Sequence, residues 1–68
     1  MNSYIIIKTI DLIDNTQTNC IIFLDSISHI IYDSNLKISR IELKNNSKLI
    51  TKLSIKKLDK LIKESKNR

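Results

Sequence analysis

The stretch Tyr4–Ile13, YIIIKTIDLI, decides the fold. It is rich in β-branched residues and has no apolar stripe at helical spacing, so it predicts a β-strand. Its odd positions, such as Ile5 and Ile7, fall on one face, and its even positions, such as Ile6, fall on the other. Both faces are apolar at the start, whereas a strand wetted on one side alternates apolar and polar residues. The stretch therefore predicts a strand that needs to be covered on both faces.

Four further segments predict strands, because each is short, apolar and bounded by turn residues. They are Cys20–Asp25 (CIIFLD), Ser26–Tyr32 (SISHIIY, a short third strand or a bent continuation of the second), Lys37–Lys44 (KISRIELK) and Lys48–Lys52 (KLITK). The predicted turns fall at Asp14–Asn19, at residues 33–35 and at Asn45-Asn46, where Asn stands in the usual place of glycine. Ile38 breaks the alternation of its strand, which predicts a bulge near Ser39.

The apolar period changes after Lys52. Ser54 suits a helix N-cap, and the apolar residues that follow it fall at helical spacing. These residues are Ile55, Leu58, Leu61 and Ile62. The pattern predicts a helix over Ile55–Ser65 with a frayed end at residues 66–68. The expected fold is α+β: one domain spanning residues 1–68, with a small antiparallel sheet of four to five strands followed by one C-terminal amphipathic helix.

Composition limits how such a chain is stabilised. A domain of 68 residues buries only about 60% of its unfolded surface, so its core is small. Cys20 is the single cysteine, and one cysteine with one histidine, His29, cannot close a structural metal site. We therefore expect no metal and no cofactor, and we expect oligomerisation to add stability. Because the chain contains no glycine, turns that need a positive φ must use Asn or Asp.

Nothing in the sequence predicts membrane insertion or export. No run reaches the roughly 18 apolar residues of a transmembrane helix. Residues 1–8 lack the basic start of a signal peptide. A lone thiol suits a reducing compartment. These features predict a cytoplasmic protein with no membrane partner.

Three motifs follow one another along the chain, and their order has a parallel in a known family. The first holds Ile27, Ile30 and Ile31, the second Ile41, Leu43, Asn45, Asn46 and Lys48, and the third Ser54, Leu58, Leu61 and Ile62. This order resembles small bacterial proteins of the flagellar-operon FlbD-like kind, which place an LIxxI segment before a T-x-I-x-L-x-N-G-K hairpin and a Ser-capped helix. Asn46 departs from the glycine of that hairpin. The resemblance implies a small β-sheet with one C-terminal helix, and it carries over no catalytic residue.

Charge is divided unevenly along the chain. Residues 1–35 hold one lysine against four aspartates, whereas residues 36–68 hold eleven cations against three acids. Such a basic half can follow a phosphate backbone. The lysines of this alternative are Lys48, Lys52, Lys56, Lys57, Lys60 and Lys63. A solvated basic surface explains the same residues, because arginine, the usual base reader, is scarce and no aromatic residue lies nearby to stack a base.

The other reactive side chains each have a plainer explanation than catalysis. Asp11, Asp14, Asp25 and Asp33 flank turns, where aspartate is common, although a carboxylate cluster also binds divalent ions. His29 could pair with Asp25 or Asp33 as an acid–base couple, but no nucleophile motif accompanies it. Cys20 leads an apolar strand, where packing explains it. We therefore expect a protein that is not an enzyme.

The apolar strands carry the functional expectation. One helix covers only one side of a sheet, so the other side is expected to present apolar groups to water, and such patches mark interfaces. A curled, barrel-like sheet that buries both faces is the alternative. We expect a small regulatory protein that self-associates or docks a protein partner through its sheet, with the contact at Ile5, Ile7, Ile22, Phe23 and Leu24.

Two other functions fit the same sequence. One is the nucleic-acid-binding module described above. The other is a phage- or plasmid-encoded inhibitor of a host defence complex, anti-CRISPR-like in kind, or a sponge for an anionic nucleotide. Small size, lopsided charge and a composition rich in Ile, Lys and Asn but without Gly or Pro, which indicates AT-rich coding, suit this last function.

Overall fold

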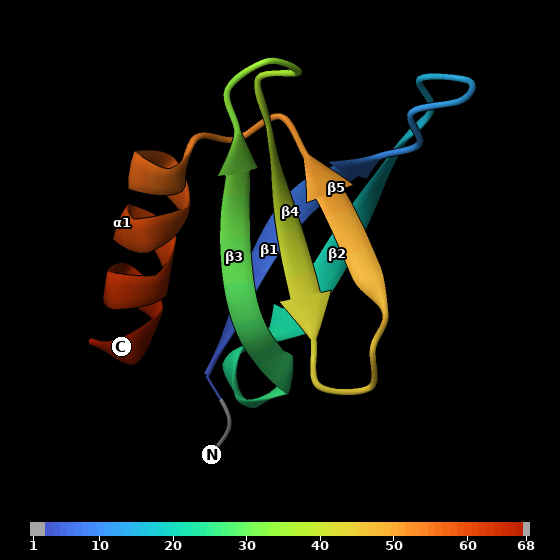
Figure 1. The fold of residues 1–68 in the computed structure, drawn as a ribbon. Helices are drawn as coiled ribbons and strands as arrows, with labels where there is room; N and C mark the ends of the chain where they lie inside the picture. Colours follow the sequence, from blue (N-terminus) through green and yellow to red (C-terminus); the bar gives the residue numbers. More distant parts are fainter. Residues whose placement is uncertain (1–2, 68) are drawn as a thin grey trace.

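The computed structural model describes residues 3–67 and contains five strands, one 3₁₀ turn and one helix (Figure 1). In chain order they are β1 (Tyr4–Ile10), β2 (Gln17–Phe23), the 3₁₀ turn η1 (Leu24–Ser26), β3 (Ile27–Asp33), β4 (Ile38–Leu43), β5 (Lys48–Thr51) and α1 (Ile55–Lys66). The predicted α+β class, with its C-terminal helix, is confirmed.

The strands form two antiparallel sheets instead of the single sheet that the sequence predicted. β1 pairs with β2 alone, and β4 lies between β3 and β5. In Figure 1 the β1–β2 hairpin crosses behind the three-stranded sheet, and α1 runs beside β3. β1 also lies against β5, where a side chain replaces main-chain pairing: the Thr51 hydroxyl donates to the Lys8 carbonyl at 2.9 Å. The crossing breaks the ladder between β1 and β5, and this accounts for the second sheet.

The core lies between the two sheets and the helix. Ile5, Ile7 and Ile22 enter it from the hairpin, Ile41 from β4 and Leu58 from α1. A second hydroxyl holds the helix to the hairpin, because Ser65 of α1 donates to the Tyr4 carbonyl at 2.7 Å. The inner face of the hairpin is thus sealed within one chain.

The first hairpin turns earlier than the sequence predicted. β1 ends at Ile10 instead of Ile13, because the Asp11 carboxylate accepts the Ile13 amide at 2.8 Å and forms a local turn. Asn15 adopts a φ of 61°, and β2 then begins at Gln17, within the predicted turn. The short turn lengthens the pairing of β1 and β2 to seven residues on each strand.

The third strand is separate, and its irregularity lies elsewhere than predicted. η1 ends β2 before Ile27, so the segment is not a bent continuation of the second strand. The register shift lies on β3 between Ile27 and His29, not near Ser39. Ser39 is buried beside Ile38, and its hydroxyl donates to the Leu53 carbonyl at 2.6 Å. This satisfied polar group explains the break in the alternation of β4 without a bulge.

The helix begins as predicted and extends one residue further. The Ser54 hydroxyl accepts the Lys57 amide at 3.2 Å, which confirms the N-cap. α1 continues to Lys66 and is capped by Asn67, so residue 66 is helical rather than frayed. Arg68, the last residue of the predicted frayed end, lies outside the described residues.

Candidate docking surface

The outer face of the β1–β2 hairpin is apolar. Tyr4 stands opposite Phe23, and Ile6 stands opposite Ile21, on the face turned away from the core. Ile6 is 57% exposed, Ile21 58% and Phe23 48%. The rings of Tyr4 and Phe23 meet edge to face, with centroids 6.2 Å apart. We call these four residues the hairpin face.

Four of the five predicted contact residues lie on the β1–β2 hairpin and Leu24 lies in η1, but most of the five face the core. Ile5, Ile7 and Ile22 are 1%, 3% and 3% exposed, so a partner on the surface does not reach them. Leu24 is half-buried against the same core. Phe23 alone of the five lies on the exposed face.

Ile6 and Ile21, the exposed isoleucines of the hairpin face, are not among the residues predicted from the sequence. Part of this face can be predicted from the sequence. Tyr4 and Ile6 are two residues apart on β1, as are Ile21 and Phe23 on β2, so the members of each pair lie on the same face of their strand. Parity groups residues by face, but it does not say which face the helix covers when both are apolar.

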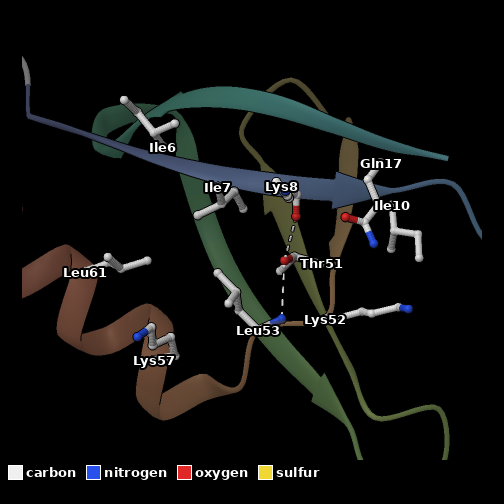
Figure 2. Close-up of a pocket in the computed structure, with 10 residues that line it drawn as sticks. All are labelled: Ile6, Ile7, Lys8, Ile10, Gln17, Thr51, Lys52, Leu53, Lys57 and Leu61. Atoms are coloured by element: carbon white, nitrogen blue, oxygen red, sulfur yellow. Dashed lines mark hydrogen bonds between the residues drawn. The ribbon is translucent and has the colours of Figure 1, made fainter. Parts of the chain in front are cut away.

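A groove opens between β1 and α1, next to the hairpin face. Its volume is about 430 Å³. Its lining comprises Ile6, Ile7, Lys8, Ile10, Gln17, Thr51, Lys52, Leu53, Lys57 and Leu61. In Figure 2 the side chains of Ile7, Leu53 and Leu61 converge on the space between strand and helix. We call this cavity the β1 groove.

The β1 groove combines an apolar floor with positive charge. Five of its residues are Ile or Leu, three are lysines, and no lining residue is acidic. Lys57 comes from the first turn of α1, and Lys52 from the segment that joins β5 to the helix. The groove therefore favours an occupant with apolar groups and negative charge.

The six lysines predicted for nucleic-acid binding do not form one surface. Lys52 and Lys57 line the β1 groove. Lys56, Lys60 and Lys63 are exposed on α1, and Asp59 lies 2.9 Å from Lys63 and offsets its charge. Lys48 lies at the start of β5 and lines a different depression, together with Thr9 and Leu49.

The outer face of the three-stranded sheet is polar. His29 Nε2 lies 2.7 Å from Glu42 Oε2, and Arg40 Nε lies 3.8 Å from the same oxygen. The Ser28 hydroxyl lies 3.1 Å from His29 Nδ1, an approach helped by the register shift at this point of β3. The predicted partners of His29, Asp25 and Asp33, are replaced by Glu42.

Ser28, His29 and Glu42 are linked in the order of a catalytic triad, but they lie on the solvent-facing side of the sheet. His29 is more than half exposed, and none of the three residues lines the β1 groove. Acyl transfer also needs donors for an oxyanion and a site that holds substrate beside the hydroxyl. We interpret these three residues as a solvated polar network that makes this face of the sheet hydrophilic.

The aspartates serve turns. Asp11 accepts the Ile13 amide, and Asp33 accepts the Asn35 and Leu36 amides. Asp14 accepts the Thr16 amide at 3.0 Å and the Thr16 hydroxyl at 2.8 Å, and these bonds lower the pKa of Asp14 from its ordinary value. Within residues 3–67 no three His, Cys, Asp or Glu side chains gather as a metal site. Cys20 is a partly buried free thiol.

Comparison with protein-family models, with curated proteins and with solved structures finds no match for this chain. The resemblance to FlbD-like proteins therefore stays a prediction. Among the described residues, no helix has the length and apolar character required to span a membrane.

Proposed function

We propose that this chain is a small, non-catalytic cytoplasmic binding protein that associates with a second copy of itself through the hairpin face. The observation that carries the proposal is the exposed cluster of Ile6, Ile21 and Phe23, with Tyr4 packed against Phe23. Contiguous apolar surface on a small protein marks an interaction site. The free thiol of Cys20 suits a reducing compartment.

Apolar burial and charge repulsion oppose each other in such an association. Full burial of one Ile or Phe side chain is worth about 1.5–3 kcal/mol, and the three exposed residues are each about half exposed. Two copies bring together a formal charge of +5 each, which opposes association. Separated surface charges are screened within about 8 Å at physiological salt, so the apolar term dominates.

A second copy fits because the hairpin face is uncharged. No cation or carboxylate belongs to it, and the next pair along the hairpin is Lys8 opposite Asn19. Two such faces can therefore meet about a twofold axis without burying a charge, as a self-complementary interface requires. The small area of the face predicts a weak dimer, with a Kd on the order of micromolar or above.

Sedimentation equilibrium tests the proposal with one matched pair of variants. Ile21→Lys places a charge at the centre of the hairpin face, and Ile31→Lys places the same charge on the outer face of the three-stranded sheet. Both residues are exposed in the described structure. We expect the parent chain and Ile31→Lys to dimerise alike, and Ile21→Lys to dimerise at least about ten-fold more weakly.

Two results would contradict the proposal. One is a parent chain that stays monomeric up to about 1 mM. The other is a dimer that Ile31→Lys disrupts and Ile21→Lys does not. Circular dichroism of both variants separates a lost contact from a lost fold.

A further inference from the structure

One edge of β1 has no main-chain ladder to another strand among the described residues. The Leu24 amide donates to the Ser3 carbonyl at 2.9 Å, and the Asp11 amide donates to the Thr16 carbonyl at 2.9 Å. Main-chain groups in an antiparallel pair alternate sides, so the odd positions of β1 face β2 and the even positions face away. Within the described residues β1 belongs to a two-stranded sheet, and no further strand bonds to its even positions.

Two side-chain hydroxyls satisfy part of this edge and leave a gap between them. Ser65 donates to the Tyr4 carbonyl and Thr51 donates to the Lys8 carbonyl. Both acceptors are even positions, as the alternation requires. Between them lie the amide and carbonyl of Ile6 and the amide of Lys8, and both residues line the β1 groove. An open row of donors and acceptors is a template for another strand.

We propose that the β1 groove binds an acidic, extended segment of a partner protein, which pairs with β1 at Ile6 and Lys8. Alternate side chains of the segment pack against the half-buried Leu53 and Leu61, next to the buried Ile7 (Figure 2). Its carboxylates meet Lys52 and Lys57 at the rim. Strand addition of this kind takes affinity from main-chain bonds and specificity from pockets for alternate side chains.

Charge complementarity selects this occupant. Three lysines and no acid line the groove, so a basic or neutral peptide gains less than an acidic one. A second copy of this chain is a poor occupant, because its own β-strands carry few acids and its net charge is +5. The outer edge of β2 also lacks a partner strand within the described residues, but the β1 groove is lined by β1, not by that edge, apart from Gln17.

The inference goes beyond the dimer proposed above and uses a different surface. The hairpin face uses the side chains of one side of the sheet, and the groove uses the free edge of β1. Only Ile6 belongs to both. Ile21→Lys therefore leaves the groove intact, and variants of Lys52 and Lys57 leave the hairpin face intact.

Amide hydrogen exchange with a defined probe tests the pairing. The probe is a synthetic peptide of four Val-Glu repeats with blocked ends, and its control has four Val-Lys repeats. We expect the Val-Glu peptide to slow exchange of the Ile6 and Lys8 amides by about ten-fold or more, because strand addition gives both amides a partner. Exchange at Asn19 and Ile21, on the β2 edge, should stay unchanged. Protection at the β2 edge instead of at β1 would overturn the proposal.

Charge reversal tests the recognition. Lys52→Glu combined with Lys57→Glu should weaken binding of the fluorescently labelled Val-Glu peptide by about ten-fold or more. Glu at residue 57 also completes a capping box with Ser54, which protects the helix. The matched control is Lys44→Glu with Lys60→Glu, which changes net charge equally outside the groove. If both double variants weaken peptide binding equally, the binding depends on net charge and not on the groove, and the proposal is overturned.

Two competitors distinguish other occupants. Dodecanoate tests a small anionic amphiphile, and a twelve-nucleotide single strand of DNA tests nucleic acid. If either binds the groove more tightly than the Val-Glu peptide and leaves the Ile6 and Lys8 amides unprotected, the assigned occupant is wrong. Dimerisation of the parent chain in the same samples reports on the hairpin face separately.

Discussion

The outer faces of both sheets carry exposed isoleucines, but the side chains around those isoleucines differ. On the three-stranded sheet, Glu42 holds His29 and Arg40 over the strand surface, and Ile31 lies among them. On the hairpin, Ile6, Ile21 and Phe23 have no such polar neighbours in their register. The difference teaches that exposure alone does not define a docking face. An isoleucine among charged and polar side chains is ordinary surface, whereas several together without charge form a candidate site.

The largest expected effect separates the two sides of the hairpin itself. Ile5→Ala removes a fully buried side chain and should cost about 2–5 kcal/mol of unfolding free energy. Ile6→Ala, one residue away on the hairpin face, should change the stability of the monomer by no more than about 0.5 kcal/mol. Urea denaturation at low protein concentration measures both. Similar losses in the two variants would mean that the hairpin face is part of the core.

A smaller effect compares the turns of the two sheets. The described residues with positive φ are Asn15 in the hairpin and Lys37 and Asn46 in the three-stranded sheet. Asn tolerates this conformation, but lysine does not, so Lys37, at 55°, is strained. Lys37→Gly should therefore stabilise the fold by about 1 kcal/mol.

The matched control for Lys37→Gly is Asn15→Ala in the turn between β1 and β2. This substitution should destabilise the fold by a similar amount, because alanine meets the Cβ clash that Asn tolerates. Thermal unfolding followed by circular dichroism measures both changes. A less stable Lys37→Gly would show that the Lys37 side chain contributes more than its backbone costs.

A still smaller effect is expected on the polar face. Glu42→Gln removes the partner of His29 and Arg40 together, yet exposed ion pairs contribute about 1 kcal/mol or less. We expect a slight loss of stability and no change in oligomeric state, measured by urea denaturation and sedimentation. A variant that assembles into larger oligomers than the parent would show that Glu42 and its partners keep the polar face from self-association.

The smallest effect lies in the hairpin turn. The pKa of Asp14 is lower in the folded chain, so its carboxylate stabilises the fold above the pKa of the unfolded chain. That contribution is lost as pH falls through the folded pKa. Asp14→Asn should therefore be slightly less stable than the parent at neutral pH, and the gap should close in acid. Urea midpoints at both pH values measure it, and a gap that widens in acid would contradict the assignment.

The sequence predicted the elements well and their assembly poorly. Period and caps located the helix, and Ser54 marked its start correctly. The pattern could not choose a face for Tyr4–Ile7, because both parities are apolar there. That choice depends on contacts far apart in sequence, such as Ser65 with Tyr4 and Thr51 with Lys8. These contacts join the hairpin to α1 and to β5.

The pairing of His29 with Glu42 could not be predicted from the sequence for a related reason. The register shift in β3 places His29 opposite Glu42, and no local signal in the sequence fixes that shift. The sequence therefore predicts its polar partner at Asp25 or Asp33, in the neighbouring turns. Residues that depend on register are harder to predict than residues that depend on period.

The hydroxyl bonds of Thr51 and Ser65 also govern how the molecule opens. Between β1 and β5 no ladder of main-chain bonds joins the described residues, so a hairpin that parts from the other sheet gives up these side-chain bonds and the burial of the core residues Ile5, Ile7 and Ile22. Such a parting leaves the β1–β2 ladder and the β3–β4–β5 ladder intact. Loss of that burial is therefore the main cost of separating the two ladders, and the amides of both ladders are expected to stay bonded until the core opens.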